Sequence, residues 1–346
     1  MIYSIFPNHT ATAYERYPDM NTSKDEILEL NKIVSSSQVA GIYNTKILLD
    51  FGFFENAPTI DADGYTASAY FLNLYAANVN TPDNSFSYEI GGVRDHWTAG
   101  LGRSTHNPKT EVGVSWNNPS PGAFWTNSKP SFDGGQTPVV VSNASLPKDD
   151  LRANITALVN SLDGSAENDT GLLIARKPAE EIDGNKYGFV NFYSAETPTI
   201  YKPRLEIHYD DFTAVTGSLT ALDTTKEYFA YQTNNLGAYK INSTPKFRFT
   251  GRVKYPAATY TSSIPATVEY LPVSSSYYSL VDVRTGETVV PFNNTFTKIS
   301  CDATGNFANL KLSGLYPDRL YQFHIRVDHN GTSDYHVLDD MFRVYE

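Results

Sequence analysis

The segment Leu320-Tyr-Gln-Phe-His-Ile-Arg-Val-Asp328 alternates apolar and polar side chains. Successive side chains of a β-strand point to opposite faces, so this period of two predicts a strand with one buried face. Phe323, Ile325 and Val327 form that face. Directly before the strand, Pro317-Asp318 is a turn signal. This part of the chain is therefore predicted to be a β-sandwich.

Similar patterns extend over the rest of the chain. Runs rich in β-branched and aromatic residues, separated by Gly, Pro, Asn and Asp, predict short strands. They cover residues 2–7, 45–51, 66–79, 138–141, 171–174, 187–193, 204–209, 228–232, 246–255, 266–271, 277–283, 298–300, 307–312 and 341–345. Eight such runs after residue 212, counting 320–328, match the spacing of an immunoglobulin-like sandwich.

Three segments need a separate interpretation. Residues 27–33 fit a strand or a helix by pattern alone. In residues 145–162, apolar side chains recur at helical spacing before Gly164, which predicts one short amphipathic helix. Asp183-Gly184 predicts a hairpin turn.

Composition supports an all-β protein, and the length allows two domains or one large β domain. The 346 residues include 13% aromatic side chains and only three Met. The segment 210–220 is small and polar, so we place the boundary there and predict domains 1–211 and 212–346. Cys301 is the single cysteine, which excludes an internal disulfide and a cysteine-based metal site.

The charge of the chain is uneven. Residues 1–211 hold 15 Lys and Arg against 26 Asp and Glu, whereas residues 212–346 hold 12 against 12, so the net charge of −11 belongs to the first part. Phosphate would be repelled, which argues against nucleic acid as a partner. No window approaches 18 apolar residues, and the first residues lack the pattern of a signal peptide. We expect synthesis in the cytoplasm and no membrane partner.

A series of local motifs in residues 1–210 follows a recognisable order. The motifs are Asn21-Thr-Ser before Leu30, Ile47-Leu-Leu-Asp-Phe51, Trp97-Thr-Ala-Gly100, Val114-Ser-Trp116-Asn117, Asn154-Ile-Thr156-Ala-Leu-Val159, Gly171-Leu-Leu173, Ser194-Ala-Glu196 and Pro203-Arg-Leu-Glu-Ile-His-Tyr209. This order resembles the bacterial DNRLRE domains, which are jelly rolls related to carbohydrate-binding modules. The resemblance implies a jelly-roll β-sandwich with one short helix, and it places Trp97 and Trp116 in the core.

The second part carries a different local signature. Leu312-x-Gly314-Leu-Tyr-Pro317-Asp-Arg-Leu-Tyr321 resembles the tyrosine corner of fibronectin type III and immunoglobulin-like domains. In that corner a Tyr near the start of a late strand bonds through its hydroxyl to the upstream backbone. Tyr321 is the predicted corner residue. The resemblance implies an immunoglobulin-like or fibronectin III-like sandwich over 212–346.

All three tryptophans lie between Arg94 and Trp125, among Gly-rich turns. Such a cluster is typical of the end of a sandwich core or of an aromatic binding surface. Because Trp125 follows a Pro-Gly-rich loop, we predict that it is exposed, and it is our candidate ligand-binding residue for a host glycan.

Other candidate sites are weaker. His324, His329 and His336 lie near Asp328, Asp339 and Asp340, but without the ligand spacing of a metal site. Asp61-Ala-Asp63-Gly64 resembles the first half of a Ca²⁺-binding loop. It lacks the distal Glu, so an ordinary turn is favoured. Whether a Ca²⁺ ion is held between other loops is left open by the sequence. We predict no catalytic residue, no metal ligand and no cofactor, because no catalytic or nucleotide-binding motif occurs.

These observations give three ranked hypotheses. Exterior-type modules without disulfides or an export signal resemble the structural proteins of tailed bacteriophages. We therefore predict a virion protein of the neck, tail, baseplate or decoration type, which contacts other virion proteins in a symmetric assembly and is not an enzyme. The first alternative is a carbohydrate-binding or receptor-binding module on the virion or cell surface. The second alternative, a glycan-cleaving enzyme, is disfavoured.

Overall fold

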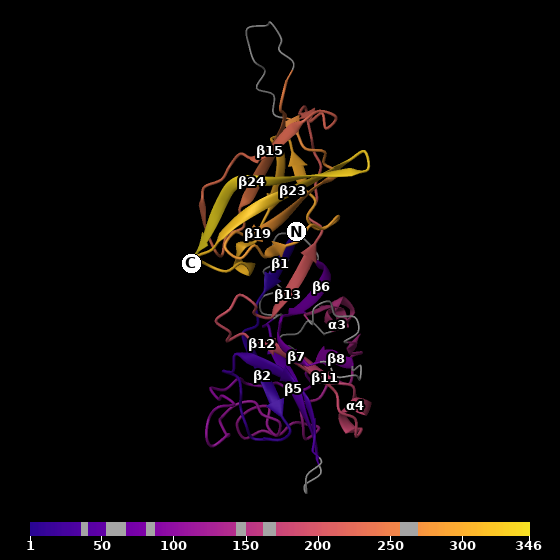
Figure 1. Ribbon diagram of the computed structural model, residues 1–346, viewed down its shortest axis with the longest axis vertical. Coiled ribbons are helices and arrows are strands. Elements are labelled where there is room, and N and C mark those ends of the chain that lie inside the picture. The colour runs from indigo at the N-terminus through magenta and orange to yellow at the C-terminus, as the bar shows by residue number, and fades with distance from the viewer. Residues whose placement is uncertain (36–40, 53–66, 81–86, 143–149, 162–170, 257–268) are drawn as a thin grey trace. The chain divides into compact units, whose positions relative to one another are not determined.

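The computed structural model describes residues 1–35, 41–52, 67–80, 87–142, 150–161, 171–256 and 269–346 (Figure 1). Strands are the main regular structure of the described residues, and the predicted all-β sandwich fold is confirmed. The chain divides into two compact units. The N-terminal unit comprises Ile5–Gly64 and Ala69–Glu206, and the C-terminal unit comprises Met1–Ser4, Tyr65–Ser68 and Ile207–Glu346.

The first thirteen strands form three sheets. Their bounds are β1 (Ile2–Ile5), β2 (His9–Tyr14), β3 (Ile27–Leu30), β4 (Lys32–Val34), β5 (Ile42–Asp50), β6 (Ala67–Leu74), β7 (Ala76–Asn80), β8 (Ser87–Gly92), β9 (Val139–Ser142), β10 (Leu151–Asn154), β11 (Leu172–Arg176), β12 (Phe189–Tyr193) and β13 (Arg204–Tyr209). One sheet has the order β2-β5-β11-β8-β9, with β4 added to β5. The other orders are β3-β12-β7 and β1-β13-β6-β10.

The β2-β5-β11-β8-β9 sheet has one face covered by a loop. In the register of the sheet, Leu48 of β5 pairs with Ala11, and its neighbour Ile47 pairs with Ile174. Because side chains alternate along a strand, Ile47 and Leu48 face opposite sides of the sheet. Leu48 and Leu173 form a buried cluster with Val114, Trp116 and Trp125, which all belong to the long connection between β8 and β9. A side chain at Gly91, in β8, would strike the Phe132 ring of the same connection. The connection therefore packs on this face of the sheet and forms part of the core.

The structure of this unit differs from the sequence-based expectations at several points and decides one alternative that was open. The short helix expected within residues 145–162 is present as α3 (Thr156–Ser161), with six residues. Leu151–Asn154 instead form β10, because they pair with β6 and the Asn154 side chain caps the Thr156 N–H at 3.0 Å. Asp183 ends the helix α4 (Pro178–Ile182) and makes no hairpin turn. The strand expected over 66–79 is split into β6 and β7. The ambiguous segment 27–33 forms strands β3 and β4.

The strands after residue 212 form two sheets. The strands are β14 (Thr220–Ala221), β15 (Tyr228–Gln232), β16 (Ala238–Lys240), β17 (Lys246–Val253), β18 (Glu269–Tyr270), β19 (Ser276–Asp282), β20 (Thr288–Val290), β21 (Ser300–Asp302), β22 (Gly305–Asn309), β23 (Leu320–His329) and β24 (Thr332–Tyr345), with a 3-10 turn, η4, at Leu312–Gly314. One sheet has the order β14-β18-β17-β22-β21 with β15 on β17, and the other β16-β24-β23-β19-β20. Figure 1 shows β23 and β24 as the long arrows of one hairpin.

Aromatic side chains fill the space between these two sheets. Phe247 of β17 meets Phe323 of β23 with 4.9 Å between ring centroids, and Phe249 meets the same ring at 5.2 Å. Phe323, Ile325 and Val327 are fully buried, as their alternation predicts. Edge-to-face aromatic pairs of this kind contribute about 0.5–1.5 kcal/mol each beyond the area they bury.

The tyrosine corner predicted at Tyr321 is present. Its hydroxyl donates to the Tyr316 carbonyl at 3.0 Å and accepts the Tyr316 N–H at 2.9 Å. Tyr321 is fully buried, and burial raises the pKa of its phenol. The contact fixes the turn before β23, while the domain type that the corner resembles stays a prediction.

Candidate binding site on the tryptophan loop

Residues 94–138, which join β8 to β9, are here called the tryptophan loop. A ladder of backbone bonds ties its two ends: Arg94 N–H donates to Ser131 O at 3.1 Å, and Asp133 N–H donates to Gly92 O at 3.0 Å. Long connections without regular strands are uncommon in compact domains and are typical of functional segments. The loop is ordered by its own core and by one buried asparagine.

Asn21 holds the middle of the tryptophan loop. Its Nδ2 donates to the Val114 carbonyl at 2.7 Å, and its Oδ1 accepts the Gly102 N–H at 2.9 Å. Ser23 Oγ accepts the neighbouring Gly100 N–H at 3.2 Å. Asn21 is fully buried, so all of these bonds are shielded from water. Two distant parts of the loop thus converge on one side chain.

The positions around Asn21 require glycine for steric reasons. A Cβ at Gly100 would lie 2.2 Å from the Val112 carbonyl oxygen and 2.5 Å from Asn21 Oδ1. A Cβ at Gly102 would lie 2.4 Å from the Asn21 carbonyl oxygen, and Gly113 also has a φ of +139°. Only glycine lets the loop backbone come this close to Asn21. The Gly-rich pattern of the sequence indicates a close contact but does not show that Asn21 makes it.

Trp125 is buried, and the prediction of an exposed Trp125 is wrong. Its side chain is 2% exposed, and its indole N–H donates to the Ser115 carbonyl at 3.0 Å. Trp116 is buried as predicted, with the Lys46 ammonium 5.6 Å from its ring centroid. The Pro-Gly-rich run before Trp125 suggested a surface loop, but the side chain packs inward on the sheet.

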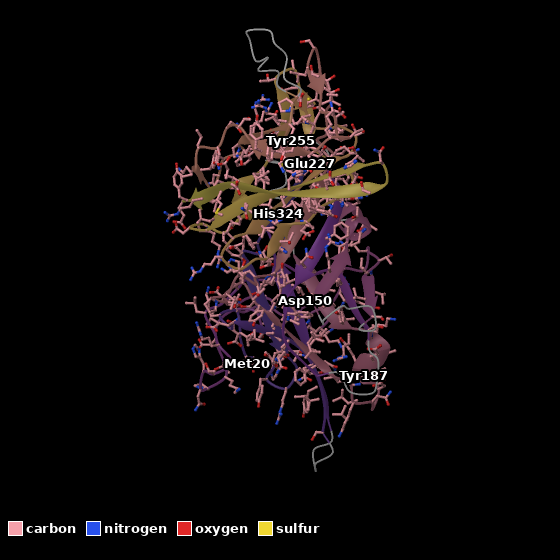
Figure 2. The ribbon with its side chains drawn as sticks, turned by 45° about the horizontal axis from the view of Figure 1, so that its top comes forward. Met20, Asp150, Tyr187, Glu227, Tyr255 and His324 are labelled. Atoms are coloured by element: carbon pink, nitrogen blue, oxygen red, sulfur yellow. The ribbon has the colours of Figure 1, made fainter. Side chains whose placement is uncertain are left out.

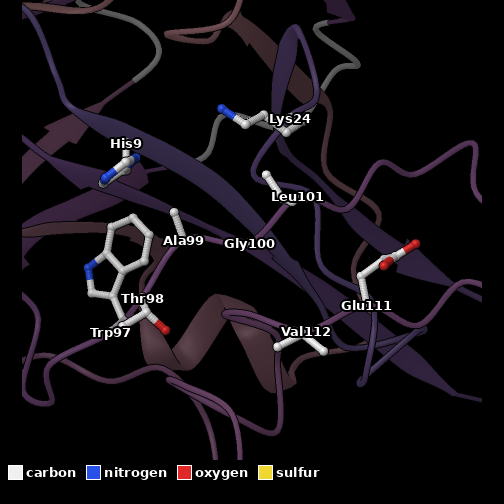
Figure 3. Close-up of a pocket in the computed structure, with 9 residues that line it drawn as sticks. All are labelled: His9, Lys24, Trp97, Thr98, Ala99, Gly100, Leu101, Glu111 and Val112. Carbon is white, nitrogen blue, oxygen red and sulfur yellow. The ribbon is translucent and has the colours of Figure 1, made fainter.

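Trp97 is the tryptophan that reaches the surface, so the core position predicted for it is only partly confirmed. It is half-buried and packs at the margin of the Trp116–Trp125 cluster. Figure 3 shows its ring beside His9 at one end of a hollow of about 670 Å³. The hollow is lined by His9, Lys24, Trp97, Thr98, Ala99, Gly100, Leu101, Glu111 and Val112. His9 comes from the start of β2, and no sequence signal linked it to Trp97.

The charged groups at this hollow are already paired. Lys24 Nζ lies 2.6 Å from Glu196 Oε1, and Glu111 Oε1 lies 2.8 Å from His106 Nδ1. The remaining groups of the hollow suit a neutral polar ligand that has one apolar face. The indole ring provides apolar contact area, and the imidazole, hydroxyl and backbone groups orient the ligand through hydrogen bonds. Of the residues that line the hollow, Glu111 is the one that carries a carboxylate.

The tryptophan loop also exposes three large apolar side chains. Leu101 is 77% exposed, Val112 is 72% exposed and Phe124 is 80% exposed. Leu101 and Val112 line the same hollow, and Asn21 bonds to the backbone at Gly102 and Val114, which follow them in the chain. Apolar groups exposed to water in this way are typical of contact surfaces.

The histidines of the C-terminal unit make local contacts. His329 Nε2 lies 2.7 Å from Asp334 Oδ2 across the β23–β24 hairpin, and Tyr228 donates to the same oxygen at 2.9 Å. His324, labelled in Figure 2, lies on β23. Within the described ranges, no group of three or more His, Cys, Asp or Glu side chains is arranged to hold a metal ion. The Asp61–Gly64 turn lies outside the described residues.

Sequence comparison gives no relative. No protein-family model matches the chain, and no curated protein matches it. In the described part of the chain, no helix has the length and apolar character needed to cross a membrane.

Three solved structures show a weak similarity. A DUF4785 family protein from Legionella pneumophila has a TM-score of 0.19 at 7% identity, over 98% of this chain and 65% of its own length. The Parabacteroides merdae β-glucuronidase has a TM-score of 0.17 at 11% identity, over 80% and 28%. The tripod from the baseplate of bacteriophage Tuc2009 has a TM-score of 0.19 at 9% identity, over 100% and 97%. At these scores the similarities carry no argument about what this protein does.

Proposed function

We propose that this protein is a non-enzymatic structural component of a tailed-phage particle, of the neck, tail, baseplate or decoration type. The observation that carries the proposal is the exposure of Leu101, Val112 and Phe124 on the tryptophan loop. Exposure of such side chains is costly in water and is offset when a neighbouring protein covers them. The two all-β units and the single cysteine fit a module that works in a particle without disulfides.

The partners in this proposal are other virion proteins and further copies of the chain in a symmetric assembly. Closed symmetric assemblies repeat the same contact, so one apolar loop per subunit gives a ring of contacts. Proteomics and electron microscopy of purified particles test the role directly. A chain detected only in the infected cytoplasm, and never in particles, would contradict it.

A loop variant tests the contact surface itself. We expect Leu101→Ser, Val112→Ser and Phe124→Ser together to leave folding intact, because all three side chains are exposed, and to reduce incorporation into particles at least about tenfold. Incorporation is measured by quantitative mass spectrometry of purified particles. The matched control is Ile182→Ser on α4, which removes an equally exposed apolar side chain outside the loop. Equal incorporation of both variants would exclude the loop as the contact.

The hollow at Trp97 favours a second candidate function, the binding of a host glycan. A half-buried indole beside His9 is a platform for the apolar face of a sugar ring. We expect Trp97→Ala to weaken binding to a neutral host polysaccharide by about tenfold or more, measured by glycan array and calorimetry. Phe124→Ala is the control, because it removes an exposed aromatic ring outside the residues that line the hollow. Unchanged binding in Trp97→Ala would remove this candidate.

A further inference from the structure

The strand β15 (Tyr228–Gln232), labelled in Figure 1, lies at the edge of its sheet. It pairs with β17 on one side, and none of the described strands pairs with its other side. An open edge presents backbone N–H and C=O groups to which another strand can bind, so proteins usually protect it with charged residues, proline, a bulge or a short length. The five residues Tyr-Phe-Ala-Tyr-Gln include no charged residue and no proline, and their pairing with β17 has no bulge.

The other outer strands described in this unit are protected. β14 has two residues, and β16, β20 and β21 have three each, which is too short to offer much pairing. β24 is long, but its pairing with β23 shifts register between Val337 and Met341, where Asp339 and Asp340 add charge. The edge of β15 therefore differs from its neighbours in being both long and uncharged.

Every second residue of β15 directs its backbone groups to the open side. The Thr233 N–H donates to the Arg248 carbonyl at 3.0 Å, and the Lys254 N–H donates to the Glu227 carbonyl at 2.8 Å. Residues that bond directly to the partner strand recur at every second position of an antiparallel pair. The odd-numbered positions of β15 therefore bond to β17, and positions 228, 230 and 232 present their N–H and C=O groups at the open edge.

The side chains of β15 divide into a buried and an exposed set. Tyr228 and Gln232 are buried, whereas Phe229 is 50% exposed and Tyr231 is 43% exposed. The two exposed rings lie on the outer face of the sheet, one on each side of Ala230. Aromatic rings left in water beside an open strand edge are typical of a contact surface.

We propose that β15 pairs antiparallel with β15 of a second copy of the chain, about a two-fold axis at Ala230. In this register Ala230 meets its own equivalent and Tyr228 meets Gln232, so all three open positions are paired, with two hydrogen bonds in each pair. Phe229 lies opposite Tyr231 of the second copy on both sides of the axis. Such cross-strand aromatic pairs stabilise a sheet.

The strand is complementary to itself in this register. Lys226 meets Asn234 of the second copy and Glu227 meets Thr233, so no like charges oppose each other across the contact. A shift by two residues leaves one open position without a partner in β15 and places an aromatic ring opposite Glu227 or Thr233. The contact uses neither the tryptophan loop nor the particle role, so its failure leaves both earlier proposals standing.

Sedimentation equilibrium of the full chain tests the pairing. We expect a reversible dimer, which Ala230→Pro weakens about tenfold or more. The Ala230 N–H points away from β17, so proline removes no bond of the native sheet and is tolerated at such an edge position. Ala230→Gly keeps the N–H and is the control, expected to dimerise like wild type.

Two outcomes of this experiment would overturn the proposal. A folded chain that stays monomeric at about 1 mM would exclude the self-pairing and would leave the edge to a strand of a different protein. A dimer that is as stable in Ala230→Pro as in wild type would show that the copies associate through another surface.

Cross-linking fixes the register and needs no proline variant to fold. In the proposed pairing, residues 229 and 231 lie opposite each other with Cα atoms about 4.5 Å apart, within the disulfide range of about 4.4–6.8 Å. Oxidised glutathione, added to an equimolar mixture of Phe229→Cys and Tyr231→Cys, should give the mixed disulfide dimer about tenfold over either self-dimer. The natural Cys301 is buried. Equal yields of the three dimers, or no disulfide dimer, would contradict the register.

Discussion

Replacing Gly100 by Ala is expected to destabilise the N-terminal unit by about 3 kcal/mol or more, because the added methyl group has no space. Its Cβ would lie 2.2 Å from a carbonyl oxygen, and backbone cannot rotate away as a side chain can. Gly113→Ala should act similarly, since Gly113 also needs a positive φ and its Cβ would lie 2.6 Å from Gly100 Cα. Urea unfolding followed by tryptophan fluorescence measures both effects, because every tryptophan lies in the affected loop.

The matched control is Gly134→Ala in the same loop. Nothing lies within 4 Å of a Cβ at Gly134, and its φ is not in the left-handed region, so its stability should stay within about 0.5 kcal/mol of wild type. Asn21→Ala should resemble Gly100→Ala, because it leaves the Gly102 N–H and the Val114 carbonyl without the partners they have in the native protein. If Gly100→Ala were as stable as Gly134→Ala, the convergence of the loop on Asn21 would be disproved.

Replacing Glu181 by Leu is the second change with a large expected effect. Lys46 Nζ lies 3.0 Å from Glu181 Oε1, and both side chains are almost wholly buried. The substitution leaves a buried ammonium with the Pro130 carbonyl, at 3.1 Å, as its remaining buried hydrogen-bond acceptor. Breaking a buried ion pair from one side costs about 3–5 kcal/mol, since the other charge stays desolvated. Chemical denaturation at pH 7 measures the loss.

Two further variants separate charge from packing. Lys46→Met combined with Glu181→Leu should recover most of the stability, because no buried charge is left unpaired. Glu196→Gln breaks the ion pair with Lys24, whose side chains are about one-third exposed, and should cost no more than about 1 kcal/mol. A single Glu181→Leu variant no less stable than Glu196→Gln would mean that Lys46 is solvated in the native state.

The pH dependence of Glu181→Leu has a defined sign. Burial lowers the pKa of Lys46 in the folded protein below its ordinary value of 10.5, and Glu181 opposes that effect. Without Glu181 the folded-state pKa falls further. Between the folded-state pKa and 10.5 the unfolded chain binds more protons, so stability from this group rises with pH in that window. The deficit of Glu181→Leu relative to wild type should therefore shrink as the pH is raised.

The local pattern of the sequence determined the strands and the corner. β15 begins and ends where its aromatic-rich run predicts, and Phe323, Ile325 and Val327 are buried together. Tyr321 makes the predicted bond to the backbone at Tyr316. These features follow from the period of side chains along one strand and from a turn beside it in the chain, so a single stretch of sequence contains the information.

The tertiary structure decided which tryptophan is buried and what surrounds the loop. Trp125 follows a turn-rich run, yet it packs on Leu48 and Leu173, which are far from it in the chain. Asn21 reaches Val114 across 93 positions, and Asn44 lines a pocket with Lys109. A short-range pattern predicts which face of a strand is apolar. It does not predict which distant segment covers that face, because burial depends on both of the surfaces that pack together. The sequence thus determined the all-β architecture, and packing between distant segments decided which side chains are buried and which reach the surface.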